Sequence, residues 1–123
     1  MIKISSEKMA PALGPYSAGV ATEQYVFLSG QLGLDQSGNL VSDDVGEQMG
    51  QALRNIGLLL NEVGLKYSNI VKTTVFITDM NDFSKVNEEY AKYFDGVCPA
   101  RSCVEVAKLP KNAKVEIECI VVK

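Results

Sequence analysis

The fold depends on the stretch Cys98-Pro99-Ala100-Arg101-Ser102-Cys103-Val104-Glu105-Val106, followed after a short connection by Val115-Glu116-Ile117-Glu118. Both segments are rich in residues that suit a β-sheet, yet an arginine and acidic residues enter the same strand pair. Arg and Glu are rarely buried unless they are paired. The pattern indicates a small carboxylate held by Arg101, with a glutamate nearby to handle a proton or a water. Alternatively, Arg101 is a solvated strand-end residue, and Glu116 and Glu118 lie on the surface of a hairpin.

Length and composition limit the kind of site that this chain can build. Its 123 residues, of which 46% are hydrophobic and 22% charged, are typical of one globular domain with a real core but little room for a deep cleft. No apolar run approaches the roughly 18 residues of a membrane span. The N-terminus lacks the apolar core of a secretory signal. We therefore expect a cytoplasmic protein with no membrane partner.

The absence of histidine is the most useful negative feature of the composition. It excludes a histidine-activated nucleophile, a histidine-ligated metal and the acid-base chemistry of typical ribonucleases. The three cysteines, Cys98, Cys103 and Cys119, are odd in number and lack metal-type spacing, which predicts reduced, buried thiols. The net charge of −3 offers no basic stripe for nucleic acid. We expect no metal site and no nucleic-acid partner.

The first third of the chain predicts an irregular arm and then a hairpin. Proline and glycine make residues 9–15 non-regular. Strands are expected within 16–22 and over 25–29. Gly30 follows the second strand, and its N–H is a candidate anion donor; alternatively, Gly30 marks a β-bulge. Residues 32–41 contain a turn cluster that we expect between short strand pieces.

Two helices and three further strands complete the pattern. Asp44 and Glu47 resemble a capping box, and Gly64 suits the end of the helix that they begin. A central strand is expected over 71–77 and a second helix over about 81–95. The closing strands are then 101–106 and 115–122.

The resulting order, β-β-(β)-α-β-α-β-β, predicts a single α+β domain over residues 1–123, with a mixed sheet and two helices packed on one face. Several strands are apolar on both faces, as Val75 with Phe76 and Ile117 with Ile120 show. Two helices can cover only one face of the sheet. We therefore expect another subunit to bury the second face, with a site at the subunit boundary.

Several separated motifs, in this order along the chain, resemble the RidA/YjgF family from about Met9 to the C-terminus. They are Gly14-Pro15-Tyr16-Ser17, Ser29-Gly30-Gln31, Val71-Lys72-Thr73-Thr74-Val75-Phe76, Asp79-Met80-Asn81-Asp82-Phe83 with Asn87 and Tyr90, Pro99 to Val106, and Val115 to Glu118. The resemblance implies a chorismate-mutase-like homotrimer with three sites between neighbouring subunits. It also implies deamination of 2-imino acids, the enamine or imine products of serine and threonine dehydration.

The resemblance assigns roles to particular residues. The residue matching Arg101 holds the substrate carboxylate, and the residue matching Glu116 positions the attacking water. The rest of the implied substrate site comprises the backbone at Gly30 and Cys103 together with Tyr16, Ser29, Phe83, Asn87 and Ser102.

Strand geometry alone supports part of this assignment. Side chains alternate with period two, so Arg101 and Cys103 share one face, as do Glu116 and Glu118. If the last two strands pair directly, Glu118 lies closer to Arg101 than Glu116 does. Local register therefore does not choose between the two acids, and the resemblance selects Glu116.

The expected chemistry needs few groups. An imine carbon that bears a carboxylate is already electrophilic, so its hydrolysis needs placement more than a strong catalyst. Arg101 supplies the placement, Glu116 orients water, and no cofactor is needed. Without a histidine partner, Cys103 is expected to be a packed residue and not a nucleophile.

Two other functions stay open on the sequence. One is a non-enzymatic trimer that senses small 2-oxo acids through Arg101, and the other is a ribonuclease or translation inhibitor. The negative net charge and the missing histidines weigh against the second.

Overall fold

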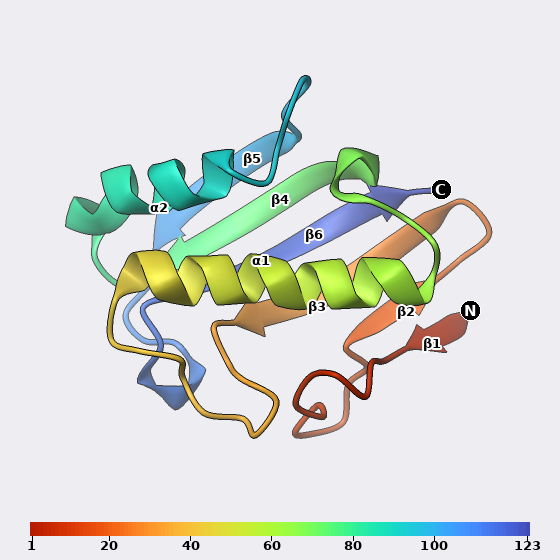
Figure 1. Cartoon of the computed structure of the whole chain (residues 1–123), viewed down its shortest axis with the longest axis horizontal. Coiled ribbons are helices and arrows are strands. Elements are labelled where there is room, and N and C mark those ends of the chain that lie inside the picture. Colours follow the sequence, from red (N-terminus) through yellow and green to blue (C-terminus); the bar gives the residue numbers. More distant parts are fainter.

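Six strands form one mixed sheet in the order β1-β2-β3-β6-β4-β5 in the computed structural model, which describes residues 1–123 (Figure 1). Neighbouring strands are antiparallel except β4 and β5, which are parallel. The strands are β1 (Ile2–Ile4), β2 (Gly19–Ala21), β3 (Tyr25–Leu32), β4 (Ile70–Ile77), β5 (Ala100–Glu105) and β6 (Val115–Val122), and the helices are α1 (Val45–Glu62) and α2 (Phe83–Ala91). The predicted α+β class is confirmed, and both helices lie on one face of the sheet.

The hairpin of β2 and β3 was predicted, but the third strand of the expected order was misplaced. The extra strand is β1, which pairs with β2 at the sheet edge. Residues 32–41 instead form a turn closed by the single bridge between Leu34 and Leu40. The side chain of Asp35 stabilises this turn, because its Oδ1 accepts hydrogen bonds from the N–H groups of Ser37 and Asn39.

Helix α1 begins and ends where the sequence predicted. Asp44 is its N-cap and accepts a 2.9 Å hydrogen bond from the N–H of Glu47. Gly64 adopts a φ of +70° just after the helix, a conformation that favours glycine. The helix has an apolar stripe at spacings of three and four, which is buried; it includes Met49, Leu53 and Ile56, each 0% exposed. Burial of this stripe fixes α1 against the sheet.

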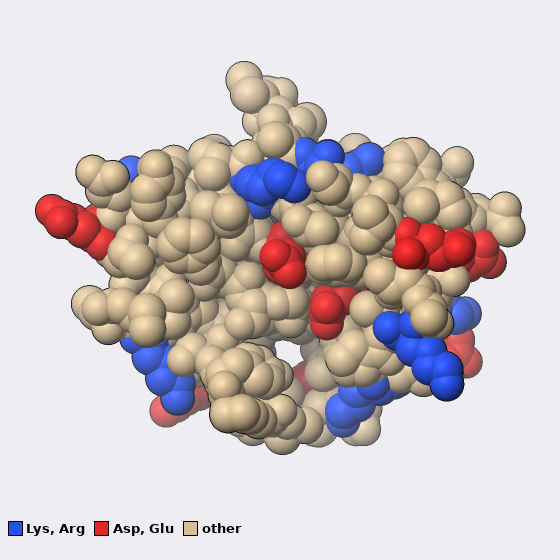
Figure 2. Space-filling view, turned by 180° about the vertical axis from the view of Figure 1, so that it is seen from behind, with Lys and Arg blue, Asp and Glu red and all other residues tan.

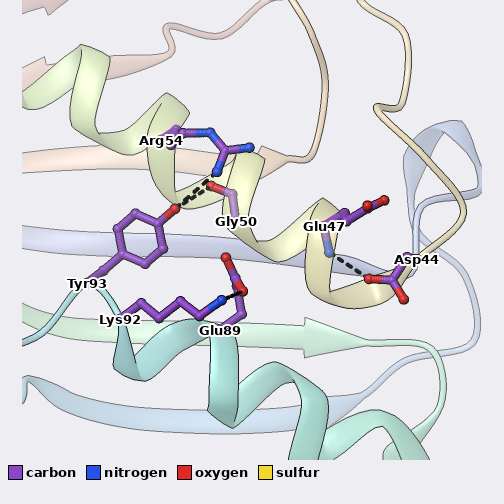
Figure 3. Close-up of polar contacts among 7 residues, drawn as sticks. All are labelled: Asp44, Glu47, Gly50, Arg54, Glu89, Lys92 and Tyr93. Carbon is purple, nitrogen blue, oxygen red and sulfur yellow. Dashed lines mark hydrogen bonds and ion pairs between the residues drawn. The ribbon is translucent and has the colours of Figure 1, made fainter.

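Helix α2 is shorter than the predicted 81–95, because its last turn tightens. Lys92 and Tyr93 donate to carbonyls three residues back, and the chain then leaves through Gly96, whose φ is +84°. The two helices are joined by Tyr93, whose hydroxyl donates to the Gly50 carbonyl and accepts from Arg54, both at 3.2 Å (Figure 3). These contacts fix α2 beside α1.

The closing strands do not pair with each other. Strand β4 lies between β5 and β6, so the conditional argument that placed Glu118 nearest to Arg101 is wrong. The chain reaches β6 from β5 by crossing over β4, and β6 then lies in the middle of the sheet between β3 and β4. A short connection does not require adjacent strands, and the parallel pairing of β5 with β4 could not be read from the local pattern.

The two faces of the sheet differ in what covers them. Val115, Ile117 and Val121 are 0% exposed under the helices. The alternate residues of the same strand and its neighbours lie on the opposite, open face, where Phe27 and Val104 are 42% and 43% exposed. Figure 2 shows this open face, with acidic groups near its centre and a hollow beside them. Neither α1 nor α2 has both the length and the apolar character that a membrane span requires.

Candidate functional site

Arg101 is held by side chains from successive turns of α2. Its Nη1 donates a 2.7 Å hydrogen bond to Oδ1 of Asn87. Its guanidinium carbon lies 5.4 Å from the ring centroid of Phe83 and 4.9 Å from that of Tyr90. Residues 83, 87 and 90 share one helical face, because they are spaced by four and three. The arginine is therefore oriented by two aromatic rings and one amide.

This arginine has no acidic partner in its own chain. The only ion pair within 4.0 Å joins Lys92 to Glu89 and does not involve Arg101 (Figure 3). Asn87 engages one N–H of the guanidinium and leaves the others for a ligand. A half-buried cation with free, forked donors can bind a carboxylate through two parallel hydrogen bonds.

Glu116 is the second residue of β6 and belongs to a second cluster of predicted site residues, which also includes Gly30 and Tyr16. Its neighbours Val115 and Ile117 point into the core, so Glu116 points to the open face, opposite Phe76 of β4. Burial raises the pKa of the Glu116 carboxyl, and the charge of Glu118 raises it further. Such a carboxyl can exchange a proton closer to neutral pH than an ordinary glutamate.

Gly30 gives the carboxyl of Glu116 its space. A Cβ atom on residue 30 would lie 2.7 Å from Cδ of Glu116, which is closer than real Cβ contacts. The pairing of β3 with β6 shifts register between Leu28 and Gln31, a stretch that includes Gly30, which favours the alternative that Gly30 marks a β-bulge. The bulge brings the β3 backbone next to the acid.

A cavity of about 270 Å³ opens beside Glu116 and Gly30. The irregular arm before β2 forms one wall, and the connection before β6 contributes another. Most of the lining is apolar and includes Pro11, Leu13 and Tyr16. The cavity can therefore receive a small molecule with a short apolar side chain.

Within one chain, the cluster of Arg101 with its partners from α2 and the cluster around Glu116 occupy opposite faces of the sheet. Arg101 pairs with the buried Thr73 and packs under α2, whereas Glu116 pairs with Phe76 on the open face. The expectation that one strand pair places a carboxylate between Arg101 and a glutamate is thus wrong for a single chain. A ligand that contacts both side chains must lie between two chains.

Comparison with known proteins identifies the family to which this sequence and fold are similar. The model of the family described as Endoribonuclease L-PSP, the RidA/YjgF family, matches residues 7–123. The chain belongs to this family. It is 52% identical to Reactive Intermediate Deaminase A, chloroplastic, of Arabidopsis thaliana over 95% of its length, and it spans 63% of that protein. It is 49% identical to the 2-iminobutanoate/2-iminopropanoate deaminase of Mus musculus, over 98% of this chain and 90% of the mouse protein.

A solved RidA/YjgF-type structure superposes over the whole chain. The structure of E. coli TdcF with bound serine has a TM-score of 0.95 and 42% identity, covering 100% of this chain and 99% of that one. The predicted resemblance is therefore confirmed, and it extends over nearly the full sequence.

The structure divides the residues predicted for the RidA/YjgF site into two groups. Phe83 and Asn87 contact Arg101, whereas Tyr16 and Gly30 line the cavity beside Glu116. Their roles toward a substrate stay predictions.

Two other predicted site residues lie apart from these contacts. The Ser29 hydroxyl donates to the Ser17 carbonyl at 2.6 Å and links β3 to the arm. Ser102 lies on the face opposite to Arg101, where its Oγ accepts from Nζ of Lys72 at 3.3 Å.

The cysteines only partly match the expectation of buried thiols. Cys119 is buried, Cys103 is half-buried and Cys98 is exposed. Burial raises the pKa of the Cys103 thiol, although the charge of Arg101 acts in the opposite direction. A raised thiol pKa disfavours the nucleophilic thiolate, which agrees with the expectation that Cys103 is a packed residue.

Two residues near the site are not among the predicted site residues. Tyr90 belongs to the motif that resembles the family but has no predicted role, and its ring contacts Arg101. Asn55 lines the cavity and donates from Nδ2 to the carbonyls of Leu32 and Leu34, at 3.2 and 3.0 Å. The available signal for Asn55 was a polar residue in a helix whose sheet-facing side is otherwise apolar.

Proposed function

We propose that this protein is a deaminase that hydrolyses 2-imino acids to 2-oxo acids and ammonia. The observation that carries the proposal is Arg101, a half-buried cation that is held by Phe83, Asn87 and Tyr90 and has no acidic partner in its chain. The names of the mouse and Arabidopsis relatives support the reaction. The serine bound to TdcF supports a ligand with an amino-acid carboxylate.

Arg101 binds and orients the substrate in this proposal. Its free N–H donors form two parallel hydrogen bonds with the carboxylate, which fixes the plane of the substrate as well as its position. The adjacent imine carbon is thereby held at one place relative to the attacking water. Placement of this kind is the main requirement for an electrophile that already reacts with water.

Glu116 handles the water and its proton. The carboxylate accepts a proton from the water while the water oxygen bonds to the imine carbon, and the C=N π electrons move to nitrogen. The same carboxyl returns this proton to the nitrogen, which gives a tetrahedral carbinolamine. It then takes the hydroxyl proton of the carbinolamine and passes it to the nitrogen, so the C–N bond breaks and ammonia leaves as the C=O bond forms. Atoms and charge balance with water alone and no change of oxidation state, so this chemistry consumes no cofactor.

The complete site lies between two subunits of a homotrimer. One subunit supplies Arg101 and its α2 partners, and its neighbour supplies Glu116, Gly30 and the cavity. The opposite placement of the two clusters supports this arrangement. So does the open face, whose apolar residues Phe27 and Val104 are exposed in the single chain.

We place this reaction in the cytoplasm, after pyridoxal-phosphate enzymes that dehydrate serine or threonine. The direct test is a competition assay in which such a dehydratase releases the imine in the presence of semicarbazide, which traps it. The expected result is that the protein diverts the flux to free 2-oxo acid, whereas Arg101→Ala does not. Unchanged trapping with both substrates would overturn the proposed reaction.

Mixed assemblies test whether each site is shared. Arg101→Ala and Glu116→Gln are each expected to be inactive when pure. In trimers re-formed from an equal mixture, one site in four combines an intact Arg101 with an intact Glu116 from its neighbour, so about one quarter of wild-type activity should return. A mixture that stays inactive would show that both residues act within one chain.

Two alternatives are separated by the same reagents. A non-enzymatic sensor of 2-oxo acids would use Arg101 in the same way, but Glu116→Gln would leave its function intact. The matching family is described as Endoribonuclease L-PSP. The net charge of −3 and the absence of histidine argue against RNA cleavage, and we expect none from the purified protein.

A further inference from the structure

The face of α2 that holds Arg101 has a third member besides the predicted site residues Phe83 and Asn87. Tyr90 lies nearer to the guanidinium carbon than Phe83 does, at 4.9 Å against 5.4 Å from the ring centroids. A cation is attracted to the face of an aromatic ring, and the attraction grows where water is excluded. Because Tyr90 is 6% exposed, its contact with Arg101 is the better shielded part of this cluster.

The Tyr90 ring is itself fixed from the neighbouring strand. Its hydroxyl shares a 2.8 Å hydrogen bond with Oγ1 of Thr73, which is 0% exposed. Thr73 lies directly opposite Arg101 in the pairing of β4 with β5. The ring also packs on Phe94 with a centroid separation of 4.6 Å. Tyr90 therefore contacts both Thr73, through its hydroxyl, and the Arg101 guanidinium, through its ring.

We infer that Tyr90, anchored by Thr73, is a positioning residue for Arg101, and that the pair sets the affinity of the site for the substrate carboxylate. This inference rests on the proposed function, because it concerns the same carboxylate anchor. Tyr90 does not need to touch the substrate. It acts by holding the guanidinium where its free N–H groups face the ligand.

The physical reason is the freedom of the arginine side chain. A free arginine populates many rotamers, and two parallel hydrogen bonds to a carboxylate select only a few of them. Tyr90 and Asn87 restrict those rotamers before the ligand arrives. Burial raises the pKa of the Tyr90 phenol, so its hydroxyl keeps its proton and the hydrogen bond to Thr73 persists at neutral pH. Preorganisation of this kind strengthens binding without a new contact to the ligand.

Variants at both ends of the hydrogen bond test the inference. Tyr90→Phe and Thr73→Val each remove one partner and leave the aromatic ring in place, whereas Tyr90→Leu removes the ring as well. The matched control is Tyr67→Phe, because the Tyr67 hydroxyl also makes one internal hydrogen bond, to the Leu53 carbonyl at 2.6 Å, but Tyr67 has no contact with Arg101. Two quantities are measured, the KM in the trapping assay and the Kd for 2-oxobutanoate by calorimetry.

The expected result is a rise in both constants with kcat nearly unchanged. Loss of the ring in Tyr90→Leu should raise KM and Kd about tenfold, and loss of the hydrogen bond about threefold. The double variant Tyr90→Phe/Thr73→Val should match either single variant, since both remove the same bond. Tyr67→Phe should keep wild-type KM and Kd even where its melting temperature falls.

Wild-type constants in Tyr90→Phe and Tyr90→Leu, together with a lower melting temperature, would reduce Tyr90 to a packing residue and overturn the inference. Calorimetry separates this failure from failure of the proposed reaction. If wild type binds 2-oxobutanoate but does not compete with the trap, the deaminase proposal fails while the Kd values still decide the role of Tyr90. If wild type binds no 2-oxo acid, the carboxylate anchor and the role of Tyr90 are both overturned.

Discussion

The carboxyl group of Glu116 occupies the space where residue 30 would carry a side chain. A Cβ atom on Gly30 would meet Cδ and Oε1 of Glu116 at 2.7 and 2.8 Å. Those atoms are the far end of a flexible side chain, so Gly30→Ala can be accommodated by turning the acid away. We expect Gly30→Ala to lower kcat about tenfold, because displaced catalytic groups lose their alignment with the reacting atom. The melting temperature should change little.

The control for this substitution is another glycine that gains one methyl group. Gly46 lies in the first turn of α1, where a Cβ would meet only Oδ2 of Asp44 at 3.1 Å. Gly46→Ala should leave kcat unchanged in the trapping assay. Wild-type kcat in Gly30→Ala would show that the carboxyl position seen here is not required for turnover.

Glu118 should affect the position of the acidic limb in the pH profile of kcat/KM. Its negative charge and the burial of Glu116 both raise the pKa of the Glu116 carboxyl. If the ionised Glu116 accepts the proton from water, kcat/KM falls as the pH drops through that pKa. Glu118→Gln removes a like charge, so the ionised form becomes easier to reach and the acidic limb of the profile should move to lower pH. An unmoved limb would exclude Glu116 as the titrating group.

The same raised pKa predicts a stability effect of opposite sign to the activity effect. A carboxyl whose folded-state pKa lies above its unfolded value stabilises the native state at low pH, and this stabilisation is lost as the pH rises through the folded-state pKa. Glu116→Gln cannot ionise, so at pH 7 it should be inactive yet melt at a higher temperature than wild type. The difference should shrink below the ordinary carboxyl pKa of 4.5. Thermal melts across this pH range measure it.

Most elements of the fold could be predicted because local signals and burial agree. The cap at Asp44 and the glycine at position 64 both pointed to one helix, and the bounds of β6 were predicted as 115–122. Strand β1 was missed because three residues at a sheet edge carry too little pattern. The order of β5, β4 and β6 was also beyond reach, since strand pairing depends on contacts distant in sequence.

The site residues could be named but not arranged. Family resemblance pointed to Arg101 and Glu116, and period two placed each on a face of its own strand. Which faces coincide depends on the neighbours, and here Thr73 places Arg101 under the helices while Phe76 places Glu116 on the open side. Tyr90 was missed for a related reason, because an aromatic residue on a helix face reads as core until its partner across the sheet is known.

The fork geometry of Arg101 should matter more than its charge. Lysine keeps the positive charge but cannot form two parallel hydrogen bonds in one plane. It also lacks the Nη1 group that donates to Oδ1 of Asn87. We expect the Kd for 2-oxobutanoate to rise about 100-fold in the inactive Arg101→Ala and about tenfold in Arg101→Lys, whose KM should rise to the same extent. Calorimetry with 2-oxobutanoate checks the same order without turnover. Equal constants for wild type and Arg101→Lys would reduce the arginine to a point charge.

Charge placed on the open face should break both assembly and activity. Phe27 lies opposite Ile120 on this face and is 42% exposed in the single chain, so Phe27→Glu does not disturb the core under the helices. In a trimer that covers the face, the new carboxylate would be buried without a partner, which costs several kcal/mol. Sedimentation velocity should show three-chain particles for wild type and a folded 13.4 kDa species for Phe27→Glu.

This variant should also be inactive, because separated chains cannot bring Arg101 of one subunit to Glu116 of another. The control is Asn61→Glu, which adds the same charge on the exposed side of α1 and should remain assembled and active. Circular dichroism confirms that each variant is folded. A wild-type chain that sediments at 13.4 kDa and still hydrolyses the imine would contradict the shared site, since the two clusters lie on opposite faces of one sheet.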